Sequence, residues 1–550
     1  MTPWQRLVGL LQLEKRDILQ IFYYAVFAGI VALSLPLGIQ AIINLIQGAQ
    51  ISTSWVVLVV IVTLGVAFSG ALQLMQLRII ETIQQRIFMR SSFELAYRFP
   101  KIKMSELRDY YPPELANRFF DTLTIQKSLS KILIDVPTAV LQILFALILL
   151  SFYHPFFIIF GLLLMVLVFV VFKFTAKKGL ETSLNESKNK YKVAHWIQEI
   201  ARSVISFKLS GSTSLGISKN DDLVSGYLKA RESHFKILML QFIQMISFKV
   251  VVTASLLLIG GALVLNQEMN IGQFVAAEII ILLVIASVEK LILGLESFYD
   301  TLTSLEKIGQ IVDKDLESQT GETPQFSKDL NIELENVSYE VSNREKHILK
   351  NISLKINSKS RILITGESGS GKSTLLRLIA GVIQATGGNV YINDMSIHSL
   401  HLNFYRSQLG LSLSDENPFE GSIRENLTFS NSDITDEKIY GILEIVGLKT
   451  FLKEQPDGLN TILYPDGRQM SYTLSKKIVL ARAILKNPKV LILEDALDRF
   501  NRAETKAIVD YLSHPERPWA LVVVSFSTVW NNKCTEIITL EKGQIKSKKA

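Results

Sequence analysis

The residues best suited to chemistry lie in one glycine-rich stretch, Arg361 to Thr374, which reads RILITGESGSGKST. It fills every fixed position of the pattern G-x-x-x-x-G-K-S with Gly366, Gly371, Lys372 and Ser373. Glycines let successive backbone N–H groups turn inward around phosphate oxygens, because no Cβ is in the way. Lys372 would reach the β- and γ-phosphates, and the Ser373 hydroxyl would ligate Mg²⁺. The predicted nucleotide contacts are Gly366, Ser368, Gly369, Ser370, Gly371, Lys372, Ser373 and Thr374.

The segments on both sides of this loop fit a phosphate-binding role. An apolar run, Ile362 to Ile364, precedes the loop, and the helix-like LLRLIAG follows it. A helix that starts there presents unpaired N–H groups and the positive end of its dipole to an anion. From residue 331 to 550, apolar β-like runs alternate with helical ones, as in IELENVSYEV, LSKKIVLARAIL and KVLILED. This alternation predicts an α/β domain with a largely parallel sheet.

The composition predicts membrane spans in addition to that folded domain. Hydrophobic residues make up 48% of the 550 residues, and the mean hydropathy is +0.28. The net charge is +7, but no basic stripe with interleaved aromatic residues predicts a nucleic-acid partner. The single cysteine, Cys534, excludes an intrachain disulfide. The N-terminus lacks the features of a signal peptide, and the spacing of Trp4, Leu7, Leu10 and Leu11 suits an amphipathic helix at the membrane surface.

Six apolar runs in the first part of the chain each have about the 20 residues that a bilayer requires. The connections between runs two and three and between runs four and five are long and basic, whereas the others are short and have no Lys or Arg. Since Lys and Arg stay on the cytoplasmic side, both termini are predicted to be cytoplasmic. The long connections have helical periodicity, so spans two to five should continue as helices beyond the membrane. The runs are Leu19–Gln47, Trp55–Leu77, Ile134–Tyr153, Phe156–Phe174, Phe242–Leu265 and Gly272–Leu293.

These patterns divide the chain into a helical membrane domain, residues 1–312, a polar linker, residues 313–330, and a nucleotide-binding domain, residues 331–550. Glu278 lies inside the sixth span, where a carboxylate is costly and normally faces a cavity or a partner. Lys249 in the fifth span is the candidate partner. A contact in a substrate or proton path and a helix-packing hydrogen bond are both open roles for Glu278.

Six spans with two long cytoplasmic connections, followed by a P-loop domain on the same chain, resemble an ABC exporter half-transporter. The stretches SLPLGIQAIIN and ELANRFFDTLTIQ resemble the type I secretion exporters in particular. The resemblance implies a dimer of half-transporters that closes around ATP and Mg²⁺ in a bacterial inner membrane. It also implies a periplasmic adaptor and an outer-membrane channel as possible partners, in addition to membrane lipid.

Several family motifs depart from the expected residues. The loop glutamine that senses Mg²⁺ and the γ-phosphate aligns with Ser414, which reaches less far. The LSGGQ signature becomes Met470 to Leu474; its serine is retained as Ser471, but Tyr472 puts bulk where a backbone would approach phosphate closely. The adenine-stacking aromatic aligns with Val341, and Tyr339 on the same strand face is the predicted substitute.

The catalytic acidic pair of the family is inverted in this chain. The Asp that orients Mg²⁺ aligns with Glu494, and the Glu that polarises the attacking water aligns with Asp495. Asp495 is still a carboxylate, but it is about one methylene short, and a misplacement of about 1 Å can cost about 100-fold in rate. The switch histidine aligns with Val524 or Ser525.

The sequence therefore predicts ATP capture with eroded hydrolysis. Three interpretations follow: a slow ATP-driven exporter subunit in a homodimer, the degenerate half of a heterodimer, or a non-hydrolysing, ATP-gated membrane protein. The substrate cannot be read from the spans, because their faces are dominated by Leu, Ile, Val and Phe.

Overall fold

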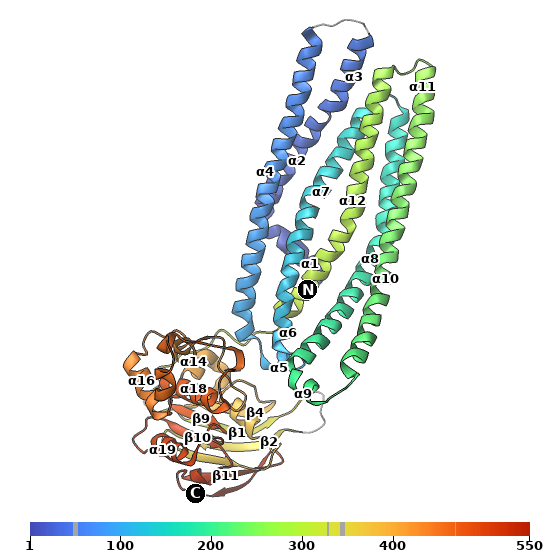
Figure 1. The fold of residues 1–550 in the computed structure, drawn as a ribbon. Coiled ribbons are helices and arrows are strands. Elements are labelled where there is room, and N and C mark those ends of the chain that lie inside the picture. The colour runs from blue at the N-terminus through green and yellow to red at the C-terminus, as the bar shows by residue number, and fades with distance from the viewer. Residues whose placement is uncertain (48–52, 327–328, 342–346, 468, 550) are drawn as a thin grey trace. The chain divides into compact units, whose positions relative to one another are not determined.

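A computed structural model describes residues 1–47, 53–326, 329–341, 347–467 and 469–549 of the chain (Figure 1). Two compact units are separated by their internal contacts. Met1–Lys101 and Leu107–Lys314 form the first unit, and Ile102–Glu106 and Asp315–Ala550 form the second. The second unit thus takes five residues from the connection that follows the second span. The predicted connection between spans one and two falls largely on 48–52, outside the described residues.

The first unit consists of helices, and among the described residues six helical stretches are long and apolar enough to cross a membrane. Several of these helices continue well beyond their apolar part: α4 has 46 residues and α8 has 47, about 70 Å each at 1.5 Å per residue. The predicted continuation of spans two to five as helices is therefore confirmed. The elements are α1 (Pro3–Leu13), α2 (Lys15–Ala32), α3 (Ser34–Gln47), α4 (Thr53–Arg98), η1 (Phe99–Lys101), α5 (Met104–Leu107), α6 (Pro112–Asn117), η2 (Arg118–Phe120), α7 (Asp121–Ser151), α8 (Phe156–Arg202), α9 (Val204–Leu209), α10 (Leu215–Ser255), the π-helical turn η3 (Leu256–Gly260), α11 (Gly261–Leu265) and α12 (Ile271–Val312).

The first span is interrupted between α2 and α3, and Pro36 explains the interruption. Proline has no N–H to donate, and its ring collides with the carbonyl four positions earlier, at Ala32. Helix α2 ends at Ala32, and α3 begins at Ser34. The kink predicted at this proline is confirmed.

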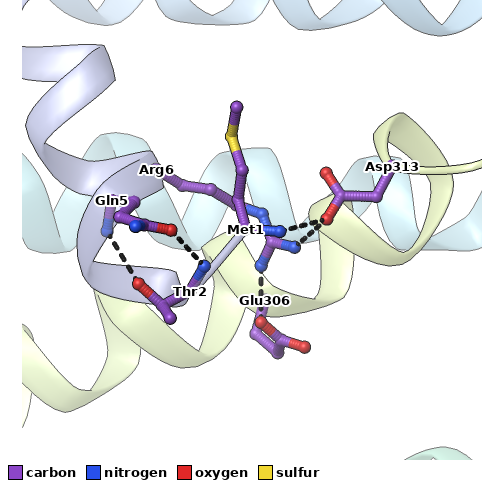
Figure 2. A network of polar contacts seen from close by, with 6 residues as sticks. All are labelled: Met1, Thr2, Gln5, Arg6, Glu306 and Asp313. Carbon is purple, nitrogen blue, oxygen red and sulfur yellow. Dashed lines mark hydrogen bonds and ion pairs between the residues drawn. The ribbon is translucent and has the colours of Figure 1, made fainter.

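The predicted N-terminal helix is present as α1, and it packs on the end of α12 (Figure 2). The Arg6 guanidinium donates to Glu306 and to Asp313, each at 2.5 Å. Gly309 makes this possible, because a Cβ at that position would lie 2.1 Å from Cζ of Arg6. Leu7 is buried in a core with residues of α2, α4, α7 and α12. At least this part of the apolar face of α1 therefore contacts protein.

The ion pair predicted between the fifth and sixth spans involves a different carboxylate. Lys249 lies 2.5 Å from Glu289, so the predicted pairing with Glu278 is wrong. Glu278 is half-buried and makes no hydrogen bond or ion pair with the residues that the structure describes. A lysine in a span is costly unless it is paired, and Glu289 supplies the partner of Lys249.

In its described residues, the second unit has three β-sheets and the helices that flank them. A four-stranded antiparallel sheet has the order β2-β1-β4-β5, and a six-stranded sheet has the order β12-β11-β3-β10-β9-β6. In the larger sheet β11, β3, β10, β9 and β6 are parallel, and only β12 is antiparallel. Strands β7 and β8 form a small antiparallel pair. The predicted α/β domain with a largely parallel sheet is confirmed.

Two hydrophobic cores hold the larger sheet, one on each face. Residues of β3, β9 and β10 contribute to both, which is why these strands are continuous apolar runs. The strands are β1 (Ile332–Tyr339), β2 (Leu349–Ile356), β3 (Arg361–Thr365), β4 (Gly387–Ile392), β5 (Met395–Ser396), β6 (Leu409–Ser412), β7 (Gly421–Ser422), β8 (Ile462–Leu463), β9 (Val490–Glu494), β10 (Ala520–Val524), β11 (Glu536–Glu541) and β12 (Gln544–Lys549). The helices are α13 (Lys372–Ile379), η4 (Ile397–Ser399), α14 (Leu402–Ser407), α15 (Ile423–Thr428), α16 (Asp436–Ile445), α17 (Lys449–Lys453), η5 (Gly458–Asn460), η6 (Pro465–Gly467), α18 (Tyr472–Leu485), α19 (Arg502–Ser513) and η7 (Thr528–Trp530).

Part of the predicted linker is fixed to the second unit. Arg406 donates two hydrogen bonds to Glu317, at 2.6 and 2.8 Å. Ile102 and Leu316 form an isolated antiparallel bridge, so the linker also carries the 102–106 segment. Glu322 forms a bridge with Leu400. The linker is polar in sequence, but several of its polar groups have defined partners.

Candidate nucleotide-binding site

The predicted site residues gather at one edge of the six-stranded sheet. The parallel strands β3, β10, β9 and β6 are successive neighbours, so their carboxyl ends meet at the same edge. The glycine loop follows β3, Ser525 follows β10, and Ser414 comes two residues after β6. Glu494 is the last residue of β9, and Asp495 comes next. Open α/β sheets bind ligands at such an edge.

The glycine loop has a backbone conformation that a side chain would not allow. Gly366 has φ +146°, and a Cβ on it would lie 2.2 Å from the carbonyl oxygen of Leu540. Gly371 has φ +100°, and its Cβ would lie 2.9 Å from the carbonyl oxygen of Ile348. Both positions therefore require glycine, and the second one starts α13.

The loop carries a lysine, and a buried hydroxyl of the loop lies beside a small cavity. Lys372 Nζ donates to the carbonyl oxygens of Gly366 and Glu367, both at 2.8 Å. The Ser370 hydroxyl is buried and has no hydrogen-bond partner among the described residues. A cavity of about 290 Å³ lies beside the loop, lined by His347, Ile348, Glu367, Ser368, Gly369, Ser370, Glu541 and Lys542. A glycine cradle, an ammonium group and an unpaired hydroxyl are donors that fit phosphate oxygens.

The predicted Mg²⁺ ligands also fit their role chemically. Mg²⁺ is usually held by one or two protein oxygens together with phosphate oxygens, and Ser373 and Glu494 would supply a hydroxyl and a carboxylate. Glu494 is 3% exposed and is held by Ser414. The Ser414 hydroxyl donates to Oε2 of Glu494 at 3.0 Å, and the Ser414 backbone N–H donates to the same oxygen at 3.3 Å. Ser414 is thus directly connected to the acidic pair.

Asp495 has a strained and poorly solvated position. Its φ is +47°, which non-glycine residues rarely adopt, and its Oδ1 is buried and finds no hydrogen-bond partner within the part of the chain that the structure describes. Burial, followed by the nearby carboxylates of Asp498 and Glu494, raises the pKa of Asp495 to about 6, and Lys372 acts in the opposite direction. A carboxyl with a pKa near neutrality can accept a proton from water.

Val524 and Ser525 are the two positions predicted to align with the switch histidine of the family: Val524 is the buried last residue of β10, and Ser525 follows it. The Ser525 hydroxyl donates to Oδ1 of Asp498 at 2.9 Å, so it is engaged with the chain that follows the acidic pair. The next residue, Phe526, is 68% exposed, and its ring lies 5.3 Å from Nζ of Lys372. Neither Ser525 nor Phe526 offers an imidazole, so proton transfer at this position would need another group.

The altered signature forms the start of α18. The Ser471 hydroxyl accepts a hydrogen bond from the backbone N–H of Leu474 at 3.2 Å and caps the helix. The Tyr472 ring is 41% exposed, and the Arg499 guanidinium lies over it at 4.4 Å. The aromatic ring therefore stands at the helix start, where the family has a bare glycine backbone.

The candidate base-stacking residues lie in different surroundings. Tyr339 ends β1 and is half-buried against the core of the antiparallel sheet, and Val341 is 4% exposed. Tyr339 and Val341 are not among the residues that line the cavity beside the glycine loop, whereas His347 is, and its Nδ1 lies 2.7 Å from Glu340. Sequence reasoning did not single out His347.

Two further residues of the site were missed because nothing in their sequence context marks them. Asp498 is the partner of Ser525 and a neighbour of Asp495. Lys476 is 2% exposed and donates to the carbonyl oxygens of Ser414 and Glu416, at 2.8 and 2.5 Å. Burial lowers the pKa of Lys476, while nearby carboxylates oppose that shift. Lys476 holds the segment that carries Ser414.

Both units match family models. The model described as "ABC transporter transmembrane region" matches residues 18–288, and the model described as "ABC transporter" matches residues 349–498. Together they cover about three quarters of the chain. The chain belongs to the ABC transporters.

Particular relatives place it near the type I secretion proteins. It is 31% identical to the toxin RTX-I translocation ATP-binding protein of Actinobacillus pleuropneumoniae over 309 residues. The aligned region covers 56% of this chain and 42% of the relative. It is 29% identical over 332 residues to the alpha-hemolysin translocation ATP-binding protein HlyB of Escherichia coli, which covers 59% of this chain and 46% of the relative. The chain thus spans less than half the length of these relatives.

The fold is that of a solved exporter. A bacterial Atm1-family ABC exporter with ATP bound superposes with a TM-score of 0.83, over 98% of this chain and 96% of that chain, at 16% identity. The predicted resemblance to an ABC exporter with membrane and nucleotide-binding domains is confirmed.

Proposed function

We propose that the chain is an ATP-binding half-transporter of an exporter, working as a dimer in the inner membrane of a bacterium. Mg–ATP would bind at the glycine loop, with Lys372 on the phosphates and with Ser373 and Glu494 on the metal. Both termini and the nucleotide-binding unit would be cytoplasmic. The two relatives are named for the translocation of a toxin and of alpha-hemolysin. For this chain, the corresponding proposal is export of a peptide or protein with a periplasmic adaptor and an outer-membrane channel.

The observation that carries the proposal is the phosphate cradle. Two glycines take a backbone that a Cβ would block, and an ammonium group and an unpaired buried hydroxyl face the same loop. A loop with only a structural role would not need an orphaned hydroxyl beside a lysine. Phosphate oxygens would satisfy both groups.

We further propose that hydrolysis is slow. Asp495 is the available base, and when nucleotide binds it would have to polarise water without a histidine at Ser525. The Ser471 hydroxyl is already used as a helix cap, and Tyr472 stands at the same helix start. The missing imidazole and the altered signature each remove a contact that could stabilise the transition state, and the loss of such contacts lowers the turnover rate.

The Tyr472 ring at the start of α18 also favours a second candidate function. A degenerate subunit that pairs with a second half-transporter, or an ATP-gated membrane protein that does not hydrolyse, would need capture of ATP but not a functional signature. In a heterodimer, the partner could supply an intact signature to this glycine loop, but it could not replace Asp495.

An ATPase assay on purified chain in lipid separates these functions. A slow exporter is expected to show Mg²⁺-dependent turnover that is lost in Asp495→Asn, and Asp495→Glu should raise the rate if the base is only too short. Turnover that is absent alone but appears with a second half-transporter would support the heterodimer. A fast rate that ignores Asp495→Asn would contradict the proposed chemistry.

A further inference from the structure

A second cationic cluster lies in the first unit, away from the glycine loop in sequence and in a different compact unit. It is built where η2, α7, α8 and α12 meet, and its residues are Arg118, Asp121, Tyr191 and Lys307. Arg118 and Lys307 are each 7% exposed, so both cations are more than nine-tenths buried. Buried charges are normally paired, because transfer from water is costly.

The Arg118 guanidinium is not satisfied by protein. Its Nε and Nη1 are buried and have no hydrogen-bond partner within the described ranges. Asp121, one helical turn on, is the obvious candidate, but its carboxylate accepts from the Tyr191 hydroxyl. A guanidinium carries five N–H donors in a planar fork, and leaving them unused in the interior is unfavourable.

Lys307 adds a second uncompensated charge. Its helical neighbour Glu306 is the nearest acid in sequence, but that carboxylate is engaged by Arg6 (Figure 2). Electrostatic repulsion acts between Lys307 and Arg118, and Asp121 attracts Lys307. The two carboxylates that attract Lys307, Asp121 and Glu306, are therefore both already engaged by other side chains.

The cations of this cluster lie around the Tyr191 ring, which does not neutralise their charge. The Arg118 guanidinium lies 5.7 Å from the ring centroid, Lys307 Nζ lies 5.0 Å away, and Lys190 Nζ lies 5.6 Å away. A cation near an aromatic face is attracted to it, but the ring carries no net charge. The arrangement brings three positive charges around one point, with unused donors on Arg118.

We propose that Arg118 and Lys307 form a binding site for a phosphate-type oxyanion, inside the helical unit and separate from the nucleotide site. Arg recognises phosphate oxygens through its planar fork, and Lys adds a compact point charge. The anion is either free phosphate or the headgroup of an anionic lipid, since both present the same oxygens. The bound anion would join η2, α8 and α12, and it would thereby stabilise the helix bundle where these elements meet.

The experiment measures the melting temperature of the full chain, purified in detergent and stripped of lipid, by tryptophan fluorescence. Lys372→Ala serves as the background, because the glycine loop also binds phosphate. Inorganic phosphate is titrated at constant ionic strength, and the melting temperature is expected to rise with the logarithm of the phosphate concentration above the Kd of the site. In a parallel series, short-chain phosphatidic acid is compared with phosphatidylcholine.

Two variants and a matched control decide the site. Arg118→Met is expected to abolish the rise, and Lys307→Met should weaken the apparent affinity about tenfold or more, since a hydrogen bond to a charged group typically contributes that much. Lys190→Met removes the same charge near the same ring from an exposed position, and it should retain the rise. If Arg118→Met does not fold, Lys307→Met and the titration of the background protein still decide.

The source of the anion follows from the two series. A rise with inorganic phosphate assigns the site to a free anion, and a rise with phosphatidic acid alone assigns it to a lipid headgroup; both support the site. A melting temperature that ignores both ligands overturns the proposal. So does a rise that persists unchanged in Arg118→Met and Lys307→Met.

Discussion

The contact between α1 and α12 yields a prediction that a simple stability argument would not make. Arg6 has a side chain that is 13% exposed, and it bonds Glu306 and Asp313, which are 31% and 37% exposed. Two charge-assisted hydrogen bonds at partly exposed acids are together worth about 2 kcal/mol. Arg6→Ala should therefore increase the open population of α1 about 30-fold, since 1.36 kcal/mol is a factor of ten.

Gly309→Ala should have nearly the same effect, although it changes a different helix and removes no charge. The added Cβ would lie 2.1 Å from Cζ and 2.3 Å from Nε of Arg6, so the guanidinium would have to leave. Its cost is thus the loss of the same two bonds. The double variant should then also open about 30-fold more often, and not about 1,000-fold, because the two changes remove one interaction.

Hydrogen exchange of the α1 amides, followed by mass spectrometry in detergent, measures this opening. Gly294→Ala is the matched control: it lies on the same helix, and a Cβ there would meet nothing within 4 Å. It should leave exchange unchanged. A double variant whose effects add, or a Gly309→Ala variant as well protected as the control, would refute the reasoning.

Three other predictions concern single contacts. Burial raises the pKa of the Cys534 thiol to about 12, so the reactive thiolate is scarcer in the native chain than in the unfolded chain. Iodoacetamide at pH 8 should therefore alkylate the native chain about 1,000-fold more slowly than the unfolded chain. Equal alkylation rates, measured by mass spectrometry, would show that the thiol is not shielded. Glu289→Gln should lower the melting temperature because it leaves Lys249 unpaired in a span, and adding Lys249→Met should restore part of it; a further loss in the double variant would contradict the pairing. Tyr472→Gly clears the start of α18, so the ATPase rate of the dimer should rise, and an unchanged rate would mean that this ring does not limit turnover.

The sequence was sufficient to predict the glycine loop, because its conformation depends on glycines that no other residue type can replace. Gly366 and Gly371 have positive φ and no room for a Cβ, and the spacing of these glycines is visible without coordinates. The spans were equally readable, since a bilayer demands long apolar helices whatever they pack against. The kink at Pro36 follows from the missing N–H of one residue.

The partner of Lys249 could have been chosen correctly by counting. When two antiparallel helices are joined by a short turn, residues that lie equally far from the turn on the two helices are neighbours. Lys249 lies 17 positions before Asn266, Glu289 lies 19 positions after Asn270, and Glu278 only 8 after it. Glu278 is deep in the span, but it lies too close to the turn to face Lys249.

Other parts of the site could not be read from the chain. The bond between Ser414 and Glu494 joins residues 80 positions apart, and it depends on β6 and β9 being neighbours in the sheet. The role of Asp498 depends on the end of β10. Only the strand order brings these residues together, and no local pattern encodes it.

The central claim, that the chain captures ATP but splits it slowly, is tested most directly by one measurement on purified protein: retention of labelled ATP with Mg²⁺, followed over time for release of phosphate. The expected result is that the protein retains ATP and that Lys372→Ala abolishes this retention. The expected turnover number is below about 1 s⁻¹, the lower end of the kcat range of typical enzymes. Failure to retain the nucleotide, or retention that Lys372→Ala leaves intact, would contradict the claim.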